Sequence, residues 1–344
     1  MEIEPNYKIK NSSSIIRYIN HTINNFQDVA EFISNICVPC TKLKIMYETS
    51  KSLILQTSDE RLVIKFYTER HGTVIHEGSI SSELAAMRSD LFPTILGTFH
   101  NAKIGIIVSK YVGVDSFEIL SSDNNRATEL TQSFCAGLVS AVDIVHQQGW
   151  THRDIKLENV VYCETDQRWR LIDFGLATKH DCPARIAGTP PFFIPHDDTK
   201  TLTHTHRVES DMFASAMAIL SFAGVICPQT KFCAQCIYNK KNSLCFRLGK
   251  CNDPRLYRIN LEWINDLANE KYILPPRISK LTNHIKLSAA VVRAALYPYR
   301  FYKYLAWDCK TLKWDFLLKN DERSFSNTSD VYGAWERLRL LVKY

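Results

Sequence analysis

The spacing of the hydrophobic residues changes near residue 110, and this change limits the folds open to the chain. Residues 42–67 hold three short segments rich in β-branched and aromatic residues, "KLKIMYE", "SLILQT" and "RLVIKFY", with polar turns between them. Such segments predict an antiparallel meander. Ile80, Leu84 and Met87 then recur at helical spacing, and "TILGTFH" and "IGIIVSKY" return to strand character. The first part of the chain is therefore expected to be strands with one helix.

The second part of the chain is expected to be mostly helical. Apolar residues recur at intervals of three and four from Leu130 to Val145, which makes one face of a helix that ends near Gly149. Farther on, "SDMFASAMAILSFAG" is apolar on all sides, as in a buried helix. Together the two halves predict an α+β fold with a small, mostly β lobe up to about residue 109 and a larger helical lobe from about residue 116.

Composition narrows the functional classes. The 344 residues are 45% hydrophobic and 23% charged, as in a soluble globular protein with a sizeable core. No apolar run approaches the roughly 18 residues of a membrane span, and the N-terminus lacks a secretory signal, so an intracellular protein, cytoplasmic or nuclear, is expected. The net charge of +6 carries no Lys/Arg block, which argues against nucleic-acid or membrane binding. Eleven cysteines then read as reduced thiols or metal ligands.

Charged residues gather in two loops, "GWTHRDIKLENV" at 149–160 and "LIDFG" at 171–175. Mg²⁺ prefers oxygen ligands completed by water and phosphate, so Asn159 and Asp173 are candidate ligands and the phosphates would come with the substrate. Asp154 would then be a general base or orienting group for a hydroxyl, and Lys156 a charge on the transferring phosphoryl group. Each residue alone could belong to a salt-bridged surface turn, but that alternative does not explain the strand that ends in "DFG".

These loops resemble the catalytic and metal-binding loops of eukaryotic-type protein kinases, through "HRDIKLENV" at 152–160 and "DFG" at 173–175. The resemblance extends over roughly residues 40–312. It implies a bilobal protein-kinase-like fold that binds ATP and Mg, with a small β-rich N-lobe carrying one helix and a larger α-rich C-lobe. Lys65 in "LVIK" resembles the lysine that holds the α- and β-phosphates. Glu83 is expected as its helix partner, and Glu77 is the competing choice.

The resemblance also assigns the nucleotide-binding linker. "VSKYVG" at 108–113 is similar to the segment that hydrogen-bonds adenine, with Ser109 at the gatekeeper position, Val112 in the linker and Val161 under the adenine ring. Asp211 resembles the buried aspartate that holds the catalytic loop, although a helix N-cap is the alternative. Lys156 together with Thr189 in "GTP" is the serine/threonine pattern. The expected substrate is therefore a protein with a Ser or Thr acceptor.

The chain departs from the family at three places. No glycine stands between residues 36 and 71, where the family has its glycine-rich loop, so "ETSKS" would have to cover the nucleotide. His196 stands where the family usually has a glutamate. Arg185 occupies the usual phosphorylation site, so Arg153 would pair with Asp181 or rest on backbone carbonyls, and activation by loop phosphorylation is not expected.

The predicted organisation has three parts: an N-terminal extension at 1–35, a kinase domain at 36–312 and a helical tail at 313–344. The kinase domain comprises an N-lobe at 36–109, a hinge at 110–115 and a C-lobe at 116–312, with a Cys-rich insertion at 227–251. Four cysteines of that insertion have a spacing compatible with one structural zinc, and free thiols are the alternative: Cys233, Cys236, Cys245 and Cys251.

The function expected from these residues is ATP-dependent phosphorylation of protein Ser or Thr residues by a divergent kinase, reminiscent of those encoded by large DNA viruses. A pseudokinase scaffold is the first alternative, favoured by the missing glycines but opposed by retention of the charged set. A small-molecule kinase of the same fold is the second alternative, and "GTPPFF" argues against it because it resembles a peptide-binding segment. The oligomeric state is not indicated.

Overall fold

The structure, a computed structural model, separates the chain into two compact units that are described one at a time. The N-terminal unit comprises Met1–Gly113 and Ile172–Gly175, and the C-terminal unit comprises Val114–Leu171 and Leu176–Tyr344. The boundary after Gly113 lies within residues 110–115, predicted as the hinge. The structure describes residues 2–4, 42–48, 52–57, 62–68, 71–101, 104–182, 184, 187–189, 192–194, 203–226, 256–271, 274, 276–297, 302–308, 313–319 and 330–342.

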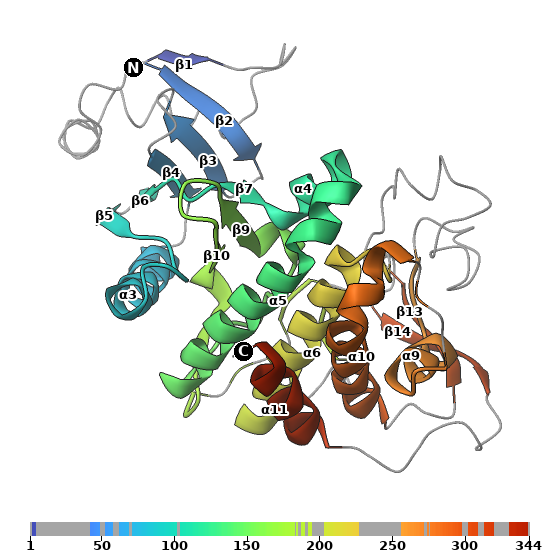
Figure 1. The fold of residues 1–344 in the computed structure, drawn as a ribbon. Helices are drawn as coiled ribbons and strands as arrows, with labels where there is room; N and C mark the ends of the chain where they lie inside the picture. The colour runs from blue at the N-terminus through green and yellow to red at the C-terminus, as the bar shows by residue number, and fades with distance from the viewer. Residues whose placement is uncertain are drawn as a thin grey trace. The chain divides into compact units, whose positions relative to one another are not determined.

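The N-terminal unit is built on one six-stranded sheet with the order β1-β2-β3-β4-β6-β5 (Figure 1). Its strands are β1 (Glu2–Glu4), β2 (Lys42–Glu48), β3 (Ser52–Thr57), β4 (Leu62–Thr68), β5 (Ile95–His100) and β6 (Ile104–Lys110). All pairs are antiparallel except β1 with β2, which is parallel. One helix, α3 (His71–Met87), connects β4 to β5. The predicted antiparallel meander, followed by helix α3 between the described strands β4 and β5, is confirmed.

Helix α3 packs against strands β5 and β6, and Gly105 of β6 lies at this contact. A Cβ atom on Gly105 would lie 2.2 Å from a methyl carbon of Val74, which is far inside van der Waals contact. Strand β6 is otherwise a nearly continuous apolar run that is buried, as expected of a central strand. The small size of Gly105 lets the backbone of β6 approach α3 closely, which brings Glu77 of the helix within reach of the sheet.

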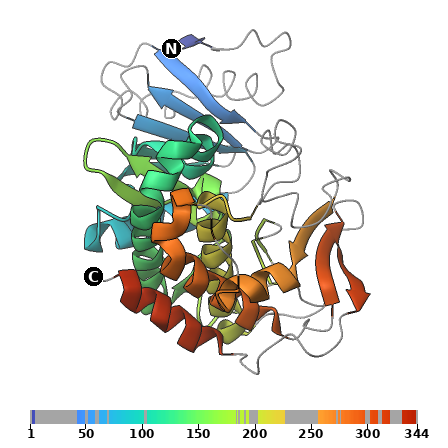
Figure 2. The same cartoon turned by 45° about the vertical axis from the view of Figure 1, so that its right-hand side comes forward.

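The C-terminal unit is mostly helical, as expected. The helices in the described part of this unit are α4 (Ser116–Ser122), α5 (Asn124–Gln147), α6 (His204–Phe222), α9 (Leu261–Ala268), α10 (Thr282–Ala295) and α11 (Val331–Val342). Short 3₁₀ turns occur at Leu157–Asn159 and Pro276–Leu281, and the turn Phe174–Leu176 begins in the N-terminal unit and ends in this one. Helices α5, α6, α10 and α11 pack side by side in both Figure 1 and Figure 2, and the contacts between them agree.

Three small sheets complete this unit. The first has the order β10-β9-β7, with β7 at Val114–Asp115, β9 at Val160–Cys163 and β10 at Arg168–Leu171. The second pairs β8 (Trp150–Thr151) with β11 (Thr178–Lys179). The third has the order β12-β13-β14, with β12 at Leu256–Asn260, β13 at Tyr302–Asp308 and β14 at Lys313–Lys319. Residues 313–344, predicted as a helical tail, thus contain a strand as well as helix α11, because "KWDFLLK" pairs along its whole length with β13.

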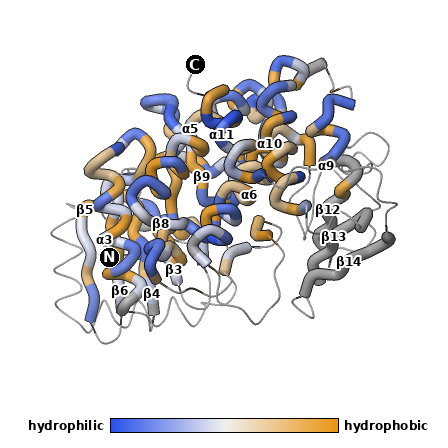
Figure 3. Tube along the Cα trace, turned by 90° about the horizontal axis from the view of Figure 1, so that it is seen from below, coloured by the Kyte–Doolittle hydropathy of each residue, from blue (hydrophilic) through white to orange (hydrophobic). Residues whose placement is uncertain are grey.

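The core of the C-terminal unit is aromatic at the contact of α5 with α6. The rings of Phe134 and Phe222 stack with centroids 4.4 Å apart, and Trp169 meets Phe134 edge-on at 4.9 Å. Hydrophobic and hydrophilic residues alternate along α5 and α10 in Figure 3, as expected of helices with one face in a core. Within the described residues, no helix combines the length and apolar character needed to span a membrane.

Candidate active site

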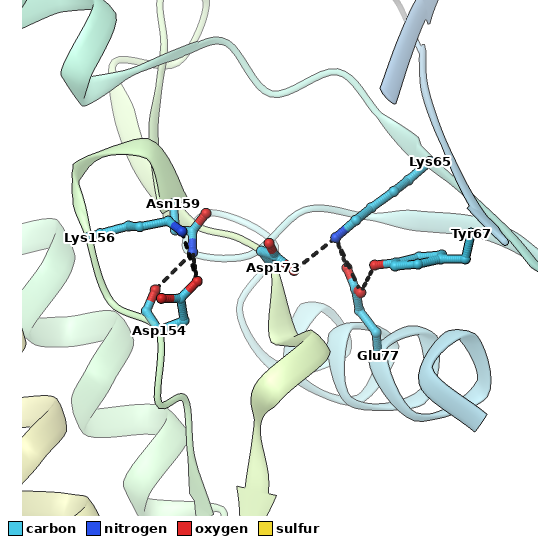
Figure 4. Close-up of polar contacts among 7 residues, drawn as sticks. All are labelled: Lys65, Tyr67, Glu77, Asp154, Lys156, Asn159 and Asp173. Carbon is cyan, nitrogen blue, oxygen red and sulfur yellow. Dashed lines mark hydrogen bonds and ion pairs between the residues drawn. The ribbon is translucent and has the colours of Figure 1, made fainter. Parts of the chain in front are cut away.

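In the N-terminal unit, two carboxylate side chains lie next to Lys65 on strand β4 (Figure 4). The Nζ atom of Lys65 lies 3.1 Å and 3.3 Å from the two carboxylate oxygens of Glu77 and 2.8 Å from Oδ1 of Asp173. An ammonium group has three donors, and three carboxylate oxygens lie within hydrogen-bonding distance here. The sequence prediction that Lys65 and Asp173 belong to one site is thus met by a direct ion pair.

The helix partner of the lysine is Glu77, so the prediction of Glu83 is wrong. Glu77 is 6% exposed and points to the sheet, whereas Glu83 is exposed on the same helix. Residues three, four and seven positions apart share a helix face, which groups Glu77 with the buried Val74, Ser81 and Leu84. Glu83 lies six residues on, roughly 120° around the helix. The spacing of Glu77 from Ile80 and Leu84, three and seven residues, already carried this signal in the sequence.

Burial and ion pairing act in opposite directions on these groups. Burial lowers the pKa of Lys65, but the carboxylates of Glu77 and Asp173 outweigh it and raise that pKa well above its usual value. Burial raises the pKa of Glu77, and the Lys65 charge pulls it down only in part. The hydroxyl of Tyr67 also donates to Glu77 Oε2, and burial raises the pKa of Tyr67, so this hydroxyl keeps its proton. The pair is a buried, hydrogen-bonded one.

Each residue of "DFG" has a conformation or a contact in this unit that requires its residue type. Asp173 follows strand β10 with a left-handed φ of 67°, a conformation that costs on the order of 1–3 kcal/mol for a non-glycine residue and is found mainly at functional sites. Phe174 is fully buried, and its ring meets Phe92 edge-on at 5.9 Å. At Gly175 a Cβ atom would lie 3.2 Å from Glu77 Oε2 and 3.4 Å from Asp173 Oδ1, so glycine leaves room for the two carboxylates.

In the C-terminal unit, Asp154 is held by three side chains, of which those of Lys156 and Asn159 are drawn in Figure 4. Lys156 Nζ donates to Asp154 Oδ2 at 2.9 Å, and Thr189 Oγ1 donates to Asp154 Oδ1 at 2.7 Å. Lys156 also donates to Thr189 Oγ1 at 3.1 Å, which closes a triangle. The amide nitrogen of Asn159 faces the carbonyl oxygen of Asp154 at 2.8 Å, and since that oxygen only accepts, the amide oxygen of Asn159 points away. Asp154, Lys156 and Asn159 are thus brought together as predicted.

The backbone of this loop is fixed by Asp211 on helix α6. Its Oδ2 accepts from the His152 amide at 2.7 Å and its Oδ1 from the Arg153 amide at 2.8 Å. Burial raises the pKa of Asp211, but the hydrogen bond and charge of His146, at 3.0 Å, outweigh it, so the pKa lies below its usual value. The helix N-cap is Thr203, so the capping alternative for Asp211 is wrong.

Sequence reasoning missed His146. Its only signal was a polar residue beside the apolar face of the helix that precedes the loop.

Comparison with known proteins agrees with this geometry. The sequence profile described as "Protein kinase domain" matches residues 48–262, more than half of the chain. The chain belongs to the protein kinase family.

Known kinases match only parts of the chain. A maternal embryonic leucine zipper kinase of Xenopus laevis is 32% identical over 104 residues, 29% of this chain and 16% of that protein. A calcium/calmodulin-dependent protein kinase type 1 of Macrobrachium nipponense is 27% identical over 127 residues, 35% of this chain and 37% of that protein. The chain thus spans much less than two thirds of these relatives. Among solved structures, the kinase PK-1 of Cydia pomonella granulovirus is 19% identical with a TM-score of 0.43, covering 57% of this chain and 75% of that chain.

The residues predicted to meet adenine are divided between the two units. Ser109 is half-buried near the end of β6, opposite Val63 and Ile95. Val112 follows β6 and is half-buried. In the C-terminal unit, Val161 on β9 is 4% exposed. Their contacts with a nucleotide stay a prediction.

The activation segment, the stretch of chain that follows "DFG", begins at Leu176, and Arg153 of the catalytic loop contacts its first residues. Arg153 Nη1 donates to the Leu176 carbonyl at 3.0 Å and to Thr178 Oγ1 at 2.6 Å. This is the arrangement on backbone carbonyls that the sequence left open beside a pair with Asp181, which is exposed.

Several predicted features lie outside the described residues. They include the glycine-free turn at 49–51, His196, and the proposed zinc ligands Cys233, Cys236, Cys245 and Cys251. Within the described ranges, no three His, Cys, Asp or Glu side chains are arranged to hold a metal ion.

Proposed function

We propose that this kinase transfers the γ-phosphoryl group of ATP to Ser or Thr residues of proteins. The observation that carries the proposal is the fixed carboxylate of Asp154, which Lys156, Thr189 and Asn159 hold in one orientation. A scaffold that only binds partners has no chemical need for an oriented acid beside a lysine. Membership of the protein kinase family supports phosphoryl transfer in general.

In this proposal Asp154 accepts the proton of the acceptor hydroxyl, or orients that hydroxyl for attack. Lys156 forms an ion pair with Asp154 in this structure, and in the complex with ATP its charge would also stabilise the transferring phosphoryl group. Lys156 and Thr189, the two residues of the serine/threonine pattern, are hydrogen-bonded to each other, which supports Ser and Thr as acceptors.

Lys65 would hold the α- and β-phosphates. Its pKa is raised, so it stays an ammonium ion at neutral pH and can offer its charge to an anion. Ser109, Val112 and Val161 would line the adenine site.

The donor set suits magnesium. Asn159 in the C-terminal unit directs its amide oxygen away from Asp154, and Asp173 in the N-terminal unit carries a side chain that is 37% exposed. Carboxylate and amide oxygens are hard ligands of the kind Mg²⁺ prefers. When bound with ATP, Mg²⁺ would neutralise charge on the phosphates. A structural zinc on the cysteine cluster at 233–251 remains a separate hypothesis.

The alternative is a pseudokinase that binds partners with little or no phosphotransfer, and the glycine-free turn at 49–51 favours it. A phosphotransfer assay with Mg-ATP and a basic protein, run on wild type and Asp154→Asn, separates the two functions. We expect wild-type activity and a loss of turnover on the order of 10²- to 10⁴-fold in the variant, with nucleotide binding kept. Nucleotide binding without turnover in wild type would establish the pseudokinase.

A further inference from the structure

Tyr67 is a polar side chain at the site for which the proposed function has no use. It lies on β4 two residues after Lys65, so the alternation of the strand puts both side chains on one face. The Tyr67 hydroxyl donates to Glu77 Oε2, and Lys65 Nζ lies 5.0 Å from the centre of the Tyr67 ring. One side chain thus contacts both members of the ion pair.

The surroundings of Tyr67 make it a rigid support. The ring is 9% exposed and belongs to an apolar cluster with Val74 of α3 and Ile107 of β6, against which Ile95 packs. A buried carboxylate that loses a hydrogen-bond donor keeps its desolvation cost, so Glu77 depends on this hydroxyl. Because the ring is fixed from the strand and from the helix, it holds the helix carboxylate at a set distance from the sheet.

We propose that Tyr67 is a positioning residue that fixes Glu77, and through it Lys65, for the nucleotide phosphates. The inference rests on the proposed function, since it assigns Lys65 to ATP. The turn between β2 and β3 contains no glycine to bring backbone N–H groups to the phosphates, so this chain relies more heavily on the lysine.

The test is Tyr67→Phe, which keeps the ring and removes one oxygen. We expect kcat/KM for ATP to fall about tenfold, the range for losing one hydrogen bond to a charged group, while KM for the protein substrate stays within about twofold. Tyr162→Phe, a buried tyrosine on β9, is the matched control and should change neither constant by more than about twofold. Unchanged ATP kinetics in Tyr67→Phe would overturn the proposal.

A double-mutant cycle shows whether Tyr67 acts through Glu77. In a Glu77→Ala background, which leaves no acceptor for the Tyr67 hydroxyl, Tyr67→Phe should change kcat/KM for ATP by less than about twofold. A full and multiplicative effect in that background would overturn the positioning role.

The same cycle can be read without activity. If wild type transfers no phosphate, the proposed function fails, but Tyr67→Phe should still lower the thermal midpoint of wild type and not that of Glu77→Ala. Equal shifts in both backgrounds would overturn the contact itself.

A second, independent observation concerns Arg207 in the first turn of α6. Its side chain is 1% exposed and donates to the carbonyls of Lys179 at 3.2 Å, His180 at 2.9 Å and Cys182. A cation in the first turn opposes the helix dipole, and burying a charge is costly. The hydrogen bonds to these three carbonyls offset both costs. The buried position of Arg207 is therefore accounted for by its contacts with residues 179–182.

The segment that Arg207 holds is the start of the activation segment. Strand β11 (Thr178–Lys179) pairs with β8, directly before the catalytic loop, and Arg153 contacts Thr178 from the loop side. Two arginines therefore hold this segment through neutral backbone and hydroxyl groups.

We infer that Arg207 orders the segment at 178–182 without any phosphate on it, which deepens the proposed function by stating how the kinase is regulated. Hydrogen exchange on chain made in bacteria and treated with phosphatase tests this directly. We expect protected amides at 178–182 in wild type, and exchange at least about tenfold faster there in Arg207→Met. Activity of wild type should survive phosphatase.

Arg207→Lys keeps the charge without the planar fork, so it should fold and show intermediate exchange. If Arg207→Met does not fold, the exchange rate at 178–182 in Arg207→Lys tests the inference instead.

Wild-type exchange in either variant, or a wild-type segment that becomes protected only after phosphorylation, would overturn the inference. Failure of phosphotransfer with normal protection at 178–182 would count against the proposed function alone.

Discussion

The pairing of Lys65 with Glu77 gives a sharp prediction, because the same helix carries a second glutamate as a control. Glu77→Gln removes one negative charge next to a buried ammonium group but leaves an amide oxygen that can accept its hydrogen bond. Asp173 Oδ1, at 2.8 Å, remains as a counter-ion. The loss should therefore fall below the 3–5 kcal/mol typical for breaking a buried pair outright.

We expect Glu77→Gln to lose about 1.5–3 kcal/mol of transition-state stabilisation, the range for a hydrogen bond to a charged group. This corresponds to roughly 10- to 100-fold in kcat/KM for ATP. Glu83→Gln replaces an exposed side chain and should stay within about 0.5 kcal/mol, or about twofold.

The assay is steady-state phosphotransfer with ATP varied and protein substrate held in excess, together with nucleotide affinity for both variants. A large loss in Glu83→Gln with normal kinetics in Glu77→Gln would refute the assignment and show that α3 presents its other face to the lysine. Equal losses in both would point to a general effect on the helix, which thermal unfolding of the two variants would reveal.

Three further predictions concern the metal, the catalytic loop and the cysteines. Asp173→Ala should abolish the stabilisation that Mg-ATP gives wild type in a thermal shift assay, because the variant loses a proposed metal ligand, and a surviving shift would contradict this. Asp211→Asn should lower stability at pH 7 by about 2–3 kcal/mol. Because the folded pKa of Asp211 lies below its usual value, its contribution is fully present above that usual value and is lost as pH falls through the folded pKa, so chemical denaturation should show wild type and variant converging at acidic pH. Elemental analysis should find close to one zinc per chain if the cysteines at 233–251 form a site, and less than about 0.2 would leave them as ordinary thiols.

Residues close together in the sequence could be assigned without the structure. Asp154, Lys156 and Asn159 lie within six positions of one loop, and the spacing to Asp173 is set by a short hairpin. The alternation of strands and the period of the helices also fixed the two-part architecture, since both depend on local backbone geometry.

The choice of Glu77 lay at the limit of what the sequence could decide. The interpretation that favoured Glu83 placed Glu77 out of register with Ile80 and Leu84, but spacings of three and seven residues put all three on one helix face. The partner is on a different strand, and the distance between them is fixed by the close approach of α3 to Gly105.

What the sequence determined by itself was the family, the two-part architecture and the residues of the catalytic loops, because these are written in local spacing and in motifs. Tertiary structure alone decided the partners of buried polar groups: Tyr67 with Glu77, His146 with Asp211, and Arg207 with carbonyls 25 to 28 residues away. A buried hydrogen bond depends on where two elements meet, and packing of helix on sheet or helix on loop sets that meeting point. No local pattern encodes it, so these contacts could be seen only in the folded chain.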